Sequence, residues 1–314
     1  MKIAISGSEG QLGLSWQNYL KGDLDDNEAK SSTIHPGYYE AKVYKSSDSE
    51  AIYWLPLNRK QFDLCMPESI HATLDRFQPD VVINTAAYTK VDQAEDEQEL
   101  AFECNAKGVY ALGKACMERD IRLVHYSTDY VFPGVEEDVL KYPSGYPETA
   151  PTAPVNIYGE TKRMGEQELL SIEGDFLILR VSWLCSAYGN NFLKTILRRA
   201  KSHGHLKVVN DQLGVPTFTE DVIEQTLELL QMDARGIFHL GSKGMISWYD
   251  FAKEILELAD INVPLEPVSS DFFPSKAVRP KFSKLSTSKI ENLGITVWPW
   301  QRSCKRVVSS LKDI

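Results

Sequence analysis

Short apolar runs alternate with longer amphipathic stretches through the first half of the chain, which is typical of strand–helix–strand units around a parallel sheet. The apolar runs predict strands at residues 2–6, 52–57, 80–85, 122–127 and 176–181. Apolar positions that recur every three or four residues predict helices at residues 12–20, 99–119 and 156–170. Strands and helices in this order favour an α/β fold with a doubly wound parallel sheet.

The alternation weakens after about residue 186, where the pattern becomes mixed. We therefore predict a first domain over residues 1–185, with later segments at about 209–235 returning to it. Residues 186–314 are expected to form mainly a second, smaller domain of mixed α/β structure.

Two segments interrupt the regular pattern. Residues 22–50 are polar and follow neither period, so we expect an exposed loop or partly mobile insertion between the first helix and the second strand. Residues 133–154 carry five prolines, which predicts an irregular crossing loop. Because loops that leave the carboxyl ends of parallel strands carry the active sites of such folds, we expect this loop beside the functional site.

Composition narrows the class of protein. The net charge of −10, from 44 acidic and 34 basic residues, argues against broad binding to nucleic acid or to an anionic membrane. No apolar stretch reaches the roughly 18 residues of a membrane span, and the first apolar run is too short for a secretion signal. The five cysteines are scattered, which favours a reducing compartment, and the six histidines lack metal-ligand spacing. These features predict a cytoplasmic protein without a metal site.

A glycine-rich turn follows the first strand and opens the first helix. It reads Gly7-Ser8-Glu9-Gly10-Gln11-Leu12-Gly13, with the spacing G-x-x-G-x-x-G. Glycines at these positions allow a tight turn and a close approach of the backbone to a pyrophosphate, to which the helix N-terminus presents N–H groups. Its place between a strand and a helix predicts a Rossmann-type dinucleotide site rather than a simple turn.

The residues after the second strand of such a sheet contact the adenosine ribose of the dinucleotide. Asn58, Arg59 and Lys60 stand there, and the first carboxylate is Asp63. Two cations and an amide suit a 2′-phosphate better than a free 2′-hydroxyl, which favours NADPH and leaves NADH open. Solvated cations on a strand-end loop are an equally good interpretation of these residues.

Tyr158 and Lys162 are four residues apart, which places both on one face of the helix predicted at 156–170. A free phenol has a pKa of about 10, and a nearby ammonium favours the phenolate. We therefore expect Lys162 to lower the pKa of Tyr158, which donates a proton to a carbonyl oxygen as hydride reaches its carbon. Such pairs are common by chance, but this one follows the glycine turn and the strand end at Thr128, whose hydroxyl is placed to hold the carbonyl.

Longer segments show a resemblance that covers nearly the whole chain apart from residues 22–50. They are residues 7–13, 79–89 (PDVVINTAAYT), 91–95 (VDQAE), 125–132 (HYSTDYVF), 156–162 (NIYGETK), 180–183 (RVSW), 189–192 (GNNF) and 210–217 (NDQLGVPT). On these segments the chain resembles the extended short-chain dehydrogenase/reductase family and, within it, the dTDP-4-dehydrorhamnose reductases. The strings STDYVF and NDQLGVPT are much more specific than the glycine triplet.

The resemblance implies reduction of the C4 ketone of dTDP-4-dehydro-L-rhamnose by NAD(P)H, with the smaller domain binding the sugar nucleotide. It places Thr128, Tyr158 and Lys162 in the catalytic triad. The motifs and the resemblance together give these cofactor contacts: Gly7, Glu9, Gly10, Gln11, Leu12, Gly13, Asn58, Arg59, Asp63, Leu64, Ala86, Ala87, Tyr88, Tyr158 and Lys162. The implied substrate contacts are Thr128, Asp129, Tyr130, Trp183, Asn190, Asn191 and Arg279, the last as a diphosphate clamp.

Several alternatives stay open at the level of sequence. The insertion at 22–50 and the loop at 134–151 depart from the family pattern beside the cofactor and sugar sites, so another nucleotide-linked 4-ketosugar, reduced or epimerised, is an alternative substrate. A non-catalytic regulatory subunit for S-adenosylmethionine synthesis is a further alternative, against which the complete triad argues. Trp183 is also interpretable as a core aromatic and Arg279 as a surface ion-pair partner. Some relatives bind Mg²⁺ between subunits through an acidic residue where this chain has Ser15, so no metal is carried over, and a homodimer stays open.

Overall fold

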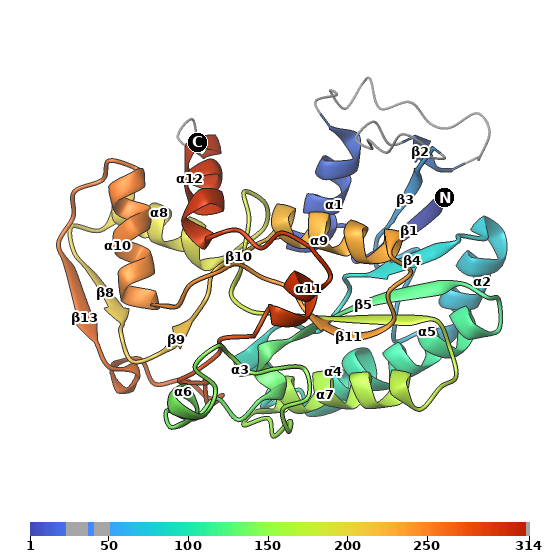
Figure 1. The fold of residues 1–314 in the computed structure, drawn as a ribbon, viewed down its shortest axis with the longest axis horizontal. Helices are drawn as coiled ribbons and strands as arrows, with labels where there is room; N and C mark the ends of the chain where they lie inside the picture. Colours follow the sequence, from blue (N-terminus) through green and yellow to red (C-terminus); the bar gives the residue numbers. More distant parts are fainter. Residues whose placement is uncertain (23–36, 41–50, 312–314) are drawn as a thin grey trace.

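The computed structural model describes residues 1–22, 37–40 and 51–311, and a seven-stranded sheet forms the centre of this part of the chain (Figure 1). Neighbouring strands pair in parallel except at one edge, where β2 (Tyr39–Glu40) is antiparallel to β3. The order across the sheet is β11 (Gly236–His239), β6 (Phe176–Val181), β5 (Arg122–Thr128), β4 (Val81–Asn84), β1 (Lys2–Ser6), β3 (Tyr53–Leu57) and β2. The doubly wound parallel sheet expected from the sequence is confirmed.

Both faces of the sheet are covered by helices, because alternate strand residues point to opposite sides. Ile3 and Ile5 of β1 pack on one side with α1 (Gln11–Lys21) and α9 (Thr219–Gln231). Ala4 points to the other side, which α2 (Pro67–Phe77), α5 (Gly108–Met117) and α7 (Ile157–Leu170) cover. The sheet therefore has one hydrophobic core on each face.

The helix predicted at 99–119 is interrupted. The chain forms α4 (Gln98–Phe102), a π-helical turn η1 (Glu103–Lys107) and then α5. The π turn packs against α7, where a side-chain carbon added at Gly165 would lie 2.2 Å from the backbone oxygen of Asn105. Apolar periodicity does not reveal this turn, because the spacing of the apolar positions changes little across one widened turn.

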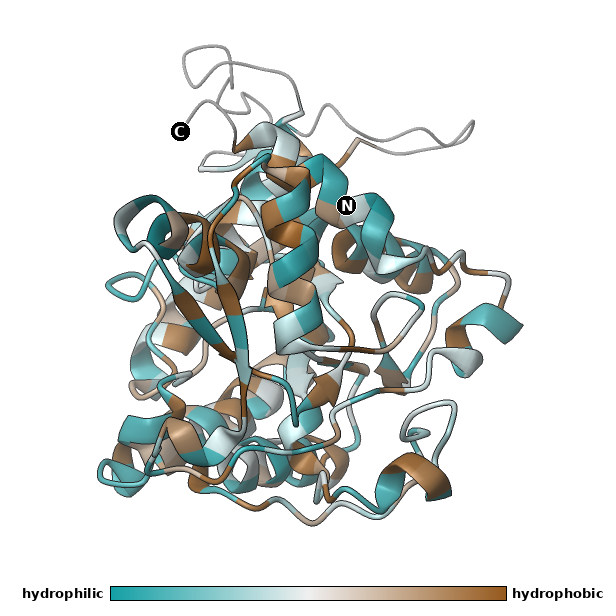
Figure 2. Cartoon of the chain, turned by 90° about the vertical axis from the view of Figure 1, so that its left-hand side faces the viewer, coloured by the Kyte–Doolittle hydropathy of each residue, from teal (hydrophilic) through white to brown (hydrophobic). Residues whose placement is uncertain are grey.

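Residues beyond the large sheet form a second cluster around α8 (Phe192–Ser202), α10 (Trp248–Leu258) and α12 (Trp300–Ser310), with the parallel pair β8 (Leu206–Val209) and β13 (Leu265–Val268). Hydrophilic and hydrophobic residues alternate along these helices (Figure 2). The pairs β7 (Leu184–Cys185) with β10 (Thr217–Phe218), and β9 (Leu213–Gly214) with β12 (Ile246–Ser247), link this cluster to the sheet. The return to the sheet continues past residue 235, because β11 is its edge strand.

The structure describes little of the first irregular segment predicted from the sequence and all of the second. The predicted insertion at 22–50 lies mostly outside the described residues, but its residues 39–40 form β2 and Tyr38 is buried against Phe77. The proline-rich segment is irregular apart from the single turn α6 (Asp138–Lys141), and it packs through Tyr146 on Phe282. The remaining short helices are α3 (Val91–Ala94), η2 (Asp129–Val131), η3 (Ser270–Phe272) and α11 (Ser288–Asn292). Among the described residues, no helix has the length and apolar character that crossing a bilayer requires.

Candidate active site

The glycine turn lies between β1 and α1, as its sequence predicts. Gly7 has φ +66°, and a side-chain carbon there would lie 2.7 Å from the backbone nitrogen of Ala86. A side-chain carbon at Gly13 would lie 2.3 Å from the carbonyl oxygen of Gly7, so only glycine allows the helix to pack this closely on the turn. Gly10 is the N-cap of helix α1, which has no side-chain capping hydrogen bond and no acidic residue in its first turn. This helix start fits an anion such as a pyrophosphate.

The end of the second parallel strand also fits a dinucleotide. Strand β3 ends at Leu57, so Asn58 and Arg59 follow it directly. The Arg59 side chain is 68% exposed, borders the cavity above the glycine turn and forms an ion pair of 3.0 Å with Asp63. Asn58 does not border the cavity, and its side-chain oxygen accepts hydrogen bonds from the backbone N–H groups of Lys60 and Gln61. Of the two cations that follow β3, Arg59 and not Lys60 therefore borders this cavity.

Helix α7 carries Tyr158 and Lys162 to the carboxyl end of β5. Asn156 caps the helix start by accepting from the Gly159 N–H, and Glu95 accepts from the Ile157 N–H at 3.0 Å. Gly159 lets this start approach η2, because a side-chain carbon there would lie 2.3 Å from the Tyr130 carbonyl oxygen. The Tyr158 and Tyr130 rings meet edge to face at 5.5 Å. Glu95 thus caps a helix that is distant in sequence.

The Tyr158 phenol differs from its sequence-based expectation. Burial raises its pKa to about 12, the Asp129 charge acts in the same direction and the Thr128 hydroxyl opposes it. The prediction that Lys162 lowers this pKa is wrong in the structure. Burial is the largest cause of this shift, and Lys162 is not among the groups that act on the phenol. The Lys162 amine instead donates to the Tyr126 carbonyl at 2.7 Å and lies 3.1 Å from His125 Nε2. Tyr158 is therefore a protonated phenol near neutral pH.

The Lys162 amine and the Asp129 carboxyl both shift toward their neutral forms. Lys162 is 2% exposed, and burial lowers its pKa to about 8, although Glu166 acts in the opposite direction. Burial also raises the pKa of Asp129 to about 7, while the Thr128 hydroxyl donates to this carboxyl at 3.0 Å. The site thus holds a carboxyl and an amine that both change charge with pH close to neutrality.

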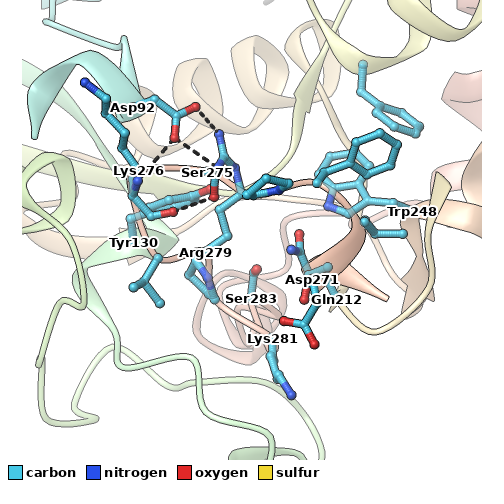
Figure 3. A pocket seen from close by; sticks show the side chains of 18 of the residues that line it. Asp92, Tyr130, Gln212, Trp248, Asp271, Ser275, Lys276, Arg279, Lys281 and Ser283 are labelled. Atoms are coloured by element: carbon cyan, nitrogen blue, oxygen red, sulfur yellow. Dashed lines mark hydrogen bonds and ion pairs between the residues drawn. The ribbon is translucent and has the colours of Figure 1, made fainter. Parts of the chain in front are cut away.

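Two cavities of about 890 and 1190 Å³ meet at this point, and Tyr130, Trp183, Phe192 and Trp248 line both. The smaller cavity follows the glycine turn and reaches Thr128, Tyr158 and Lys162. The larger one is bordered by Asp92, Gln212 and Arg279 (Figure 3). A dinucleotide and a second, polar ligand could therefore lie end to end, with the tyrosine at their junction.

Most residues expected to contact a ligand border these cavities. The smaller cavity is lined by Gly7, Glu9, Gly10, Gln11, Leu12, Arg59, Asp63, Leu64, Ala86, Ala87, Tyr88, Thr128, Asp129, Tyr130, Tyr158, Lys162, Trp183 and Asn190. Three expected residues, Gly13, Asn58 and Asn191, do not line either one. Asn191 caps α8 by accepting from the Lys194 N–H at 3.1 Å, and its amide donates to the Ser186 carbonyl. Helix capping and turn formation occupy these amide groups.

Arg279 lines the larger cavity and is already paired. Its two terminal nitrogens bind the two carboxylate oxygens of Asp92 at 2.7 and 3.2 Å, as Figure 3 shows. The side chain remains 32% exposed. The ion pair fits the simpler interpretation of Arg279, and a role as diphosphate clamp stays a prediction.

Sequence reasoning missed Trp248 of α10. Its ring stacks on Trp183 with centroids 3.5 Å apart, and Trp183 itself has φ +46°, a backbone region that non-glycine residues rarely adopt. Gly214 allows this position, since a side-chain carbon there would lie 2.5 Å from the Trp183 ring. Trp248 follows a strand of two residues and resembles any core aromatic of an amphipathic helix, so the sequence carries no signal for its role.

Comparison with known proteins identifies the family. The family model described as the RmlD substrate binding domain matches residues 36–312. The dTDP-4-dehydrorhamnose reductase of Escherichia coli (strain K12) is 39% identical over 261 residues, which cover 79% of this chain and 85% of that protein. The chain belongs to the dTDP-4-dehydrorhamnose reductase family. The resemblance seen in the sequence motifs is confirmed.

Other members of the dTDP-4-dehydrorhamnose reductase family match over nearly the full length. The enzyme of Aggregatibacter actinomycetemcomitans is 35% identical over 320 residues, which cover 98% of each chain. The crystal structure of the dTDP-4-dehydrorhamnose reductase of Bacillus anthracis, in complex with NADP, has a TM-score of 0.83 at 33% identity and covers 98% of this chain and 99% of that chain. The family likeness therefore includes both the sheet and the second cluster of helices.

Proposed function

We propose that this protein reduces the C4 ketone of dTDP-4-dehydro-L-rhamnose with NADPH, giving dTDP-L-rhamnose in dTDP-rhamnose biosynthesis. The observation that carries the proposal is the position of Tyr158, a protonated phenol beside Thr128 at the junction of the two cavities. Membership of the dTDP-4-dehydrorhamnose reductase family supports the choice of substrate.

The proton in this reaction comes from Tyr158. A reduction needs a group that is still protonated when the ketone oxygen gains negative charge, and burial keeps Tyr158 in that form. Thr128 offers a hydroxyl within the same pocket, which orients the ketone oxygen toward the phenol. Lys162 lies one helical turn from Tyr158 and borders the same cavity.

NADPH supplies the hydride when it is bound. The N-terminus of α1 and the turn at Gly7 and Gly10 would hold its pyrophosphate, and Ala86 lies where the backbone passes that turn. Arg59 would bind the 2′-phosphate, which is the reason to prefer NADPH over NADH. The complex of the Bacillus anthracis relative with NADP supports this preference.

The sugar nucleotide would occupy the larger cavity. Trp183 and Trp248 offer a stacked aromatic surface, and Tyr130 and Arg279 offer polar groups on the opposite side. We therefore propose that residues 1–185 with the returning strand β11 bind the cofactor, and that residues 186–314 mainly bind the sugar nucleotide. The cytoplasmic location and the homodimer considered from the sequence stay predictions.

The proposal is tested by NADPH oxidation, followed as loss of absorbance, with dTDP-4-dehydro-L-rhamnose generated in the same tube. We expect oxidation that depends on the ketosugar and yields dTDP-L-rhamnose. Cofactor binding without oxidation would contradict this substrate and direct the search to other nucleotide 4-ketosugars. Retention of one bound NAD through many turnovers would instead indicate an epimerase.

The variant Tyr158→Phe tests the proton donor. It removes one hydroxyl and keeps the ring against Tyr130, so we expect NADPH binding to be unchanged while kcat falls about 10²- to 10⁴-fold. Tyr142→Phe is the control, because Tyr142 lies on the proline-rich loop and borders neither cavity. Wild-type turnover in Tyr158→Phe would remove the central claim.

A further inference from the structure

Two cysteines that are 39 residues apart in the sequence meet beside the smaller cavity. Cys65 lies in the loop between β3 and α2, and Cys104 lies in the π turn η1. Their sulfur atoms are 2.7 Å apart. Both residues are partly exposed, whereas the other three cysteines of the chain are buried. The cysteines that are scattered in the sequence therefore include one pair that the fold brings into contact.

The backbone next to each cysteine is held in place by its neighbours. Leu64 is 4% exposed, and its carbonyl oxygen would lie 2.4 Å from a side-chain carbon added at Gly108, so the loop rests directly on the start of α5. Asn105, next to Cys104, accepts from the Tyr88 N–H at 2.8 Å and donates to the Tyr88 carbonyl at 3.0 Å. Because both segments are anchored in this way, the contact between the two sulfur atoms is a product of the fold.

The cysteine pair is connected to Arg59 through one carboxylate. Asp63 Oδ1 accepts from the Cys65 N–H at 3.0 Å, and Asp63 Oδ2 forms the 3.0 Å ion pair with Arg59. Burial acts to raise the pKa of this carboxyl, but hydrogen bonds from Cys65 and Arg59 outweigh it and hold the pKa below its usual range. Arg59 and Cys104 both border the smaller cavity. A movement of Cys65 therefore reaches the cation that we propose for the 2′-phosphate of NADPH.

We propose that Cys65 and Cys104 form a redox-active pair, which a small disulfide such as oxidised glutathione converts reversibly to a protein disulfide, and that bound NADPH opposes this oxidation. Formation of the disulfide depends only on the contact between the two sulfur atoms. The effect of NADPH rests on the proposed function. In a compartment that keeps thiols reduced, such a disulfide is transient and serves as a redox sensor rather than as a permanent cross-link.

The oxidation is a thiol–disulfide exchange in two steps. The Cys65 thiol releases its proton to solvent, and its thiolate attacks one sulfur of oxidised glutathione. A bond forms between Cys65 and that sulfur, the disulfide of glutathione breaks, and one glutathione leaves as a thiolate. The Cys104 thiol then releases its proton and attacks Cys65 Sγ, which forms the protein disulfide and expels the second glutathione. The two glutathione thiolates take up the two protons, so the protein loses two electrons and oxidised glutathione gains them.

The surroundings of the two thiols assign the order of these steps. Burial raises the pKa of the Cys104 thiol, and its contact with Cys65 acts in the same direction, while Arg59 opposes both. A thiol with a raised pKa holds little thiolate near neutral pH and reacts slowly with an oxidant from solvent. Cys65 therefore makes the first attack, and Cys104 already lies beside Cys65 Sγ for the second.

Bound NADPH opposes the oxidation because both act on the same loop. A disulfide bond is about 2.05 Å long, so its formation draws Cys65 toward η1, and Asp63 and Arg59 move with the loop. NADPH that is bound through Arg59 would hold this loop in its reduced position. The coupling is reciprocal: the factor by which NADPH disfavours the disulfide equals the factor by which the disulfide weakens NADPH binding.

The first test equilibrates the full chain with mixtures of reduced and oxidised glutathione in the absence of cofactor. Free thiols are then blocked by alkylation, and the disulfide is located by mass spectrometry of peptides. We expect one disulfide, between Cys65 and Cys104, which dithiothreitol reverses. A chain that keeps both thiols, or that ends as a mixed disulfide with glutathione, would overturn the proposal whether or not the protein reduces any ketosugar.

The second test repeats the equilibration with saturating NADPH. We expect half-oxidation to need a ratio of oxidised glutathione to the square of reduced glutathione that is about fivefold higher or more. The dissociation constant of NADPH, measured by fluorescence, should be higher for the oxidised protein by the same factor. An unchanged midpoint in a protein that binds NADPH would overturn the coupling. Failure to bind NADPH would overturn the proposed function and the coupling with it, but not the redox-active pair.

The variants Cys65→Ser and Cys104→Ser each remove one sulfur of the pair. We expect oxidised glutathione to leave the dissociation constant of NADPH unchanged in both. Cys116→Ala is the matched control, because it also leaves four cysteines but keeps the pair, and Cys116 is buried in α5 and borders neither cavity. We expect the wild-type midpoint in this control. An oxidation-dependent loss of NADPH affinity in Cys65→Ser as large as that of wild type would contradict the proposal. If a serine variant does not fold, the peptides of the oxidised wild-type chain decide the question.

Discussion

Lys162 is 2% exposed, yet it is a residue whose charged form is favoured in water. Burial lowers its pKa to about 8, from an ordinary value near 10.5. Burial of this amine next to Tyr158 therefore lowers the free energy of unfolding of the protein. This pattern is typical of functional sites, where local groups are arranged for chemistry at a cost in stability.

The first prediction at residue scale is that Lys162→Met changes stability in a pH-dependent way. Between pH 8 and 10.5 the unfolded state binds the lysine proton more readily than the folded state, so wild-type stability rises with pH in this window. The burial cost is complete below pH 8, on the order of 3 kcal/mol, and absent above pH 10.5. We expect the stability of Lys162→Met relative to wild type to be most favourable below pH 8 and to decline toward pH 10.

Denaturant unfolding of both proteins at pH 7, 8.5 and 10 measures this difference. Lys114→Met serves as the control, because Lys114 lies on α5 and is not fully buried. A stability difference that is constant with pH would mean that Lys162 keeps its ordinary pKa in the folded protein.

The second prediction at this scale concerns the choice of cofactor. Arg59 borders the cofactor cavity, whereas the neighbouring Lys60 is exposed and does not. We expect Arg59→Ala to raise the KM for NADPH roughly tenfold, about 1.4 kcal/mol, and to leave the KM for NADH nearly unchanged. Lys60→Ala should alter neither constant. An equal rise in the KM for NADPH and for NADH in Arg59→Ala would show that this side chain does not bind the 2′-phosphate.

Helix α7 carries Tyr158 and Lys162, and two of its glycines allow close contacts with neighbouring elements. Gly159 allows its start to approach η2, and Gly165 allows its middle to approach the π turn η1. Asn105 of that turn donates to Thr161 at 3.0 Å and to the carbonyl of Tyr88, so the turn links α7 to the end of β4. Helix position, and with it the position of Tyr158 and Lys162, depends on this backbone contact.

At this scale we predict that Gly165→Ala weakens both stability and catalysis. The added carbon would lie 2.2 Å from the Asn105 oxygen, so the helix must move away from η1. We expect a loss of about 1–3 kcal/mol of unfolding free energy, with a fall in kcat. Gly204→Ala is the control, because nothing lies within 4 Å of its added carbon. Thermal unfolding and turnover are measured on both variants. Wild-type stability and kcat in Gly165→Ala would show that neither depends on the close contact between α7 and η1.

The whole molecule brings two groups of elements together at the stacked rings of Trp183 and Trp248. Trp183 follows the sheet strand β6, whereas Trp248 begins α10 in the second cluster. Their stack forms a shared wall of the two cavities that we propose for the cofactor and the sugar nucleotide. Aromatic surface at such a junction contributes binding energy to a ligand that lies across it.

The prediction at this scale is that Trp248→Ala separates sugar binding from cofactor binding. We expect the KM for the ketosugar to rise about tenfold or more, while the dissociation constant of NADPH changes little. Trp298→Ala is the matched control, since Trp298 is 41% exposed and borders neither cavity. Fluorescence titration with NADPH and steady-state kinetics with the ketosugar distinguish the outcomes. A matching loss of NADPH affinity would place Trp248 at the cofactor instead.

The positions of the central strands along the chain, the glycine turn and the spacing of Tyr158 and Lys162 could be predicted from the sequence, because each depends on residues that are close along the chain. The strands 2–6 and 176–181 coincide with β1 and β6, and the helix at 156–170 differs from α7 by one residue. Local periodicity and turn chemistry are sufficient for such elements.

The environment of the site was decided by tertiary structure alone. The pKa of Tyr158 depends on burial by distant segments, and this reversed the expectation based on its neighbour Lys162. The contact of Asn84 with His125, and that of Trp183 with Trp248, join residues 41 and 65 positions apart. A sequence specifies which groups are present and their local spacing, but desolvation and hydrogen-bond partners depend on what packs around each group once the chain has folded.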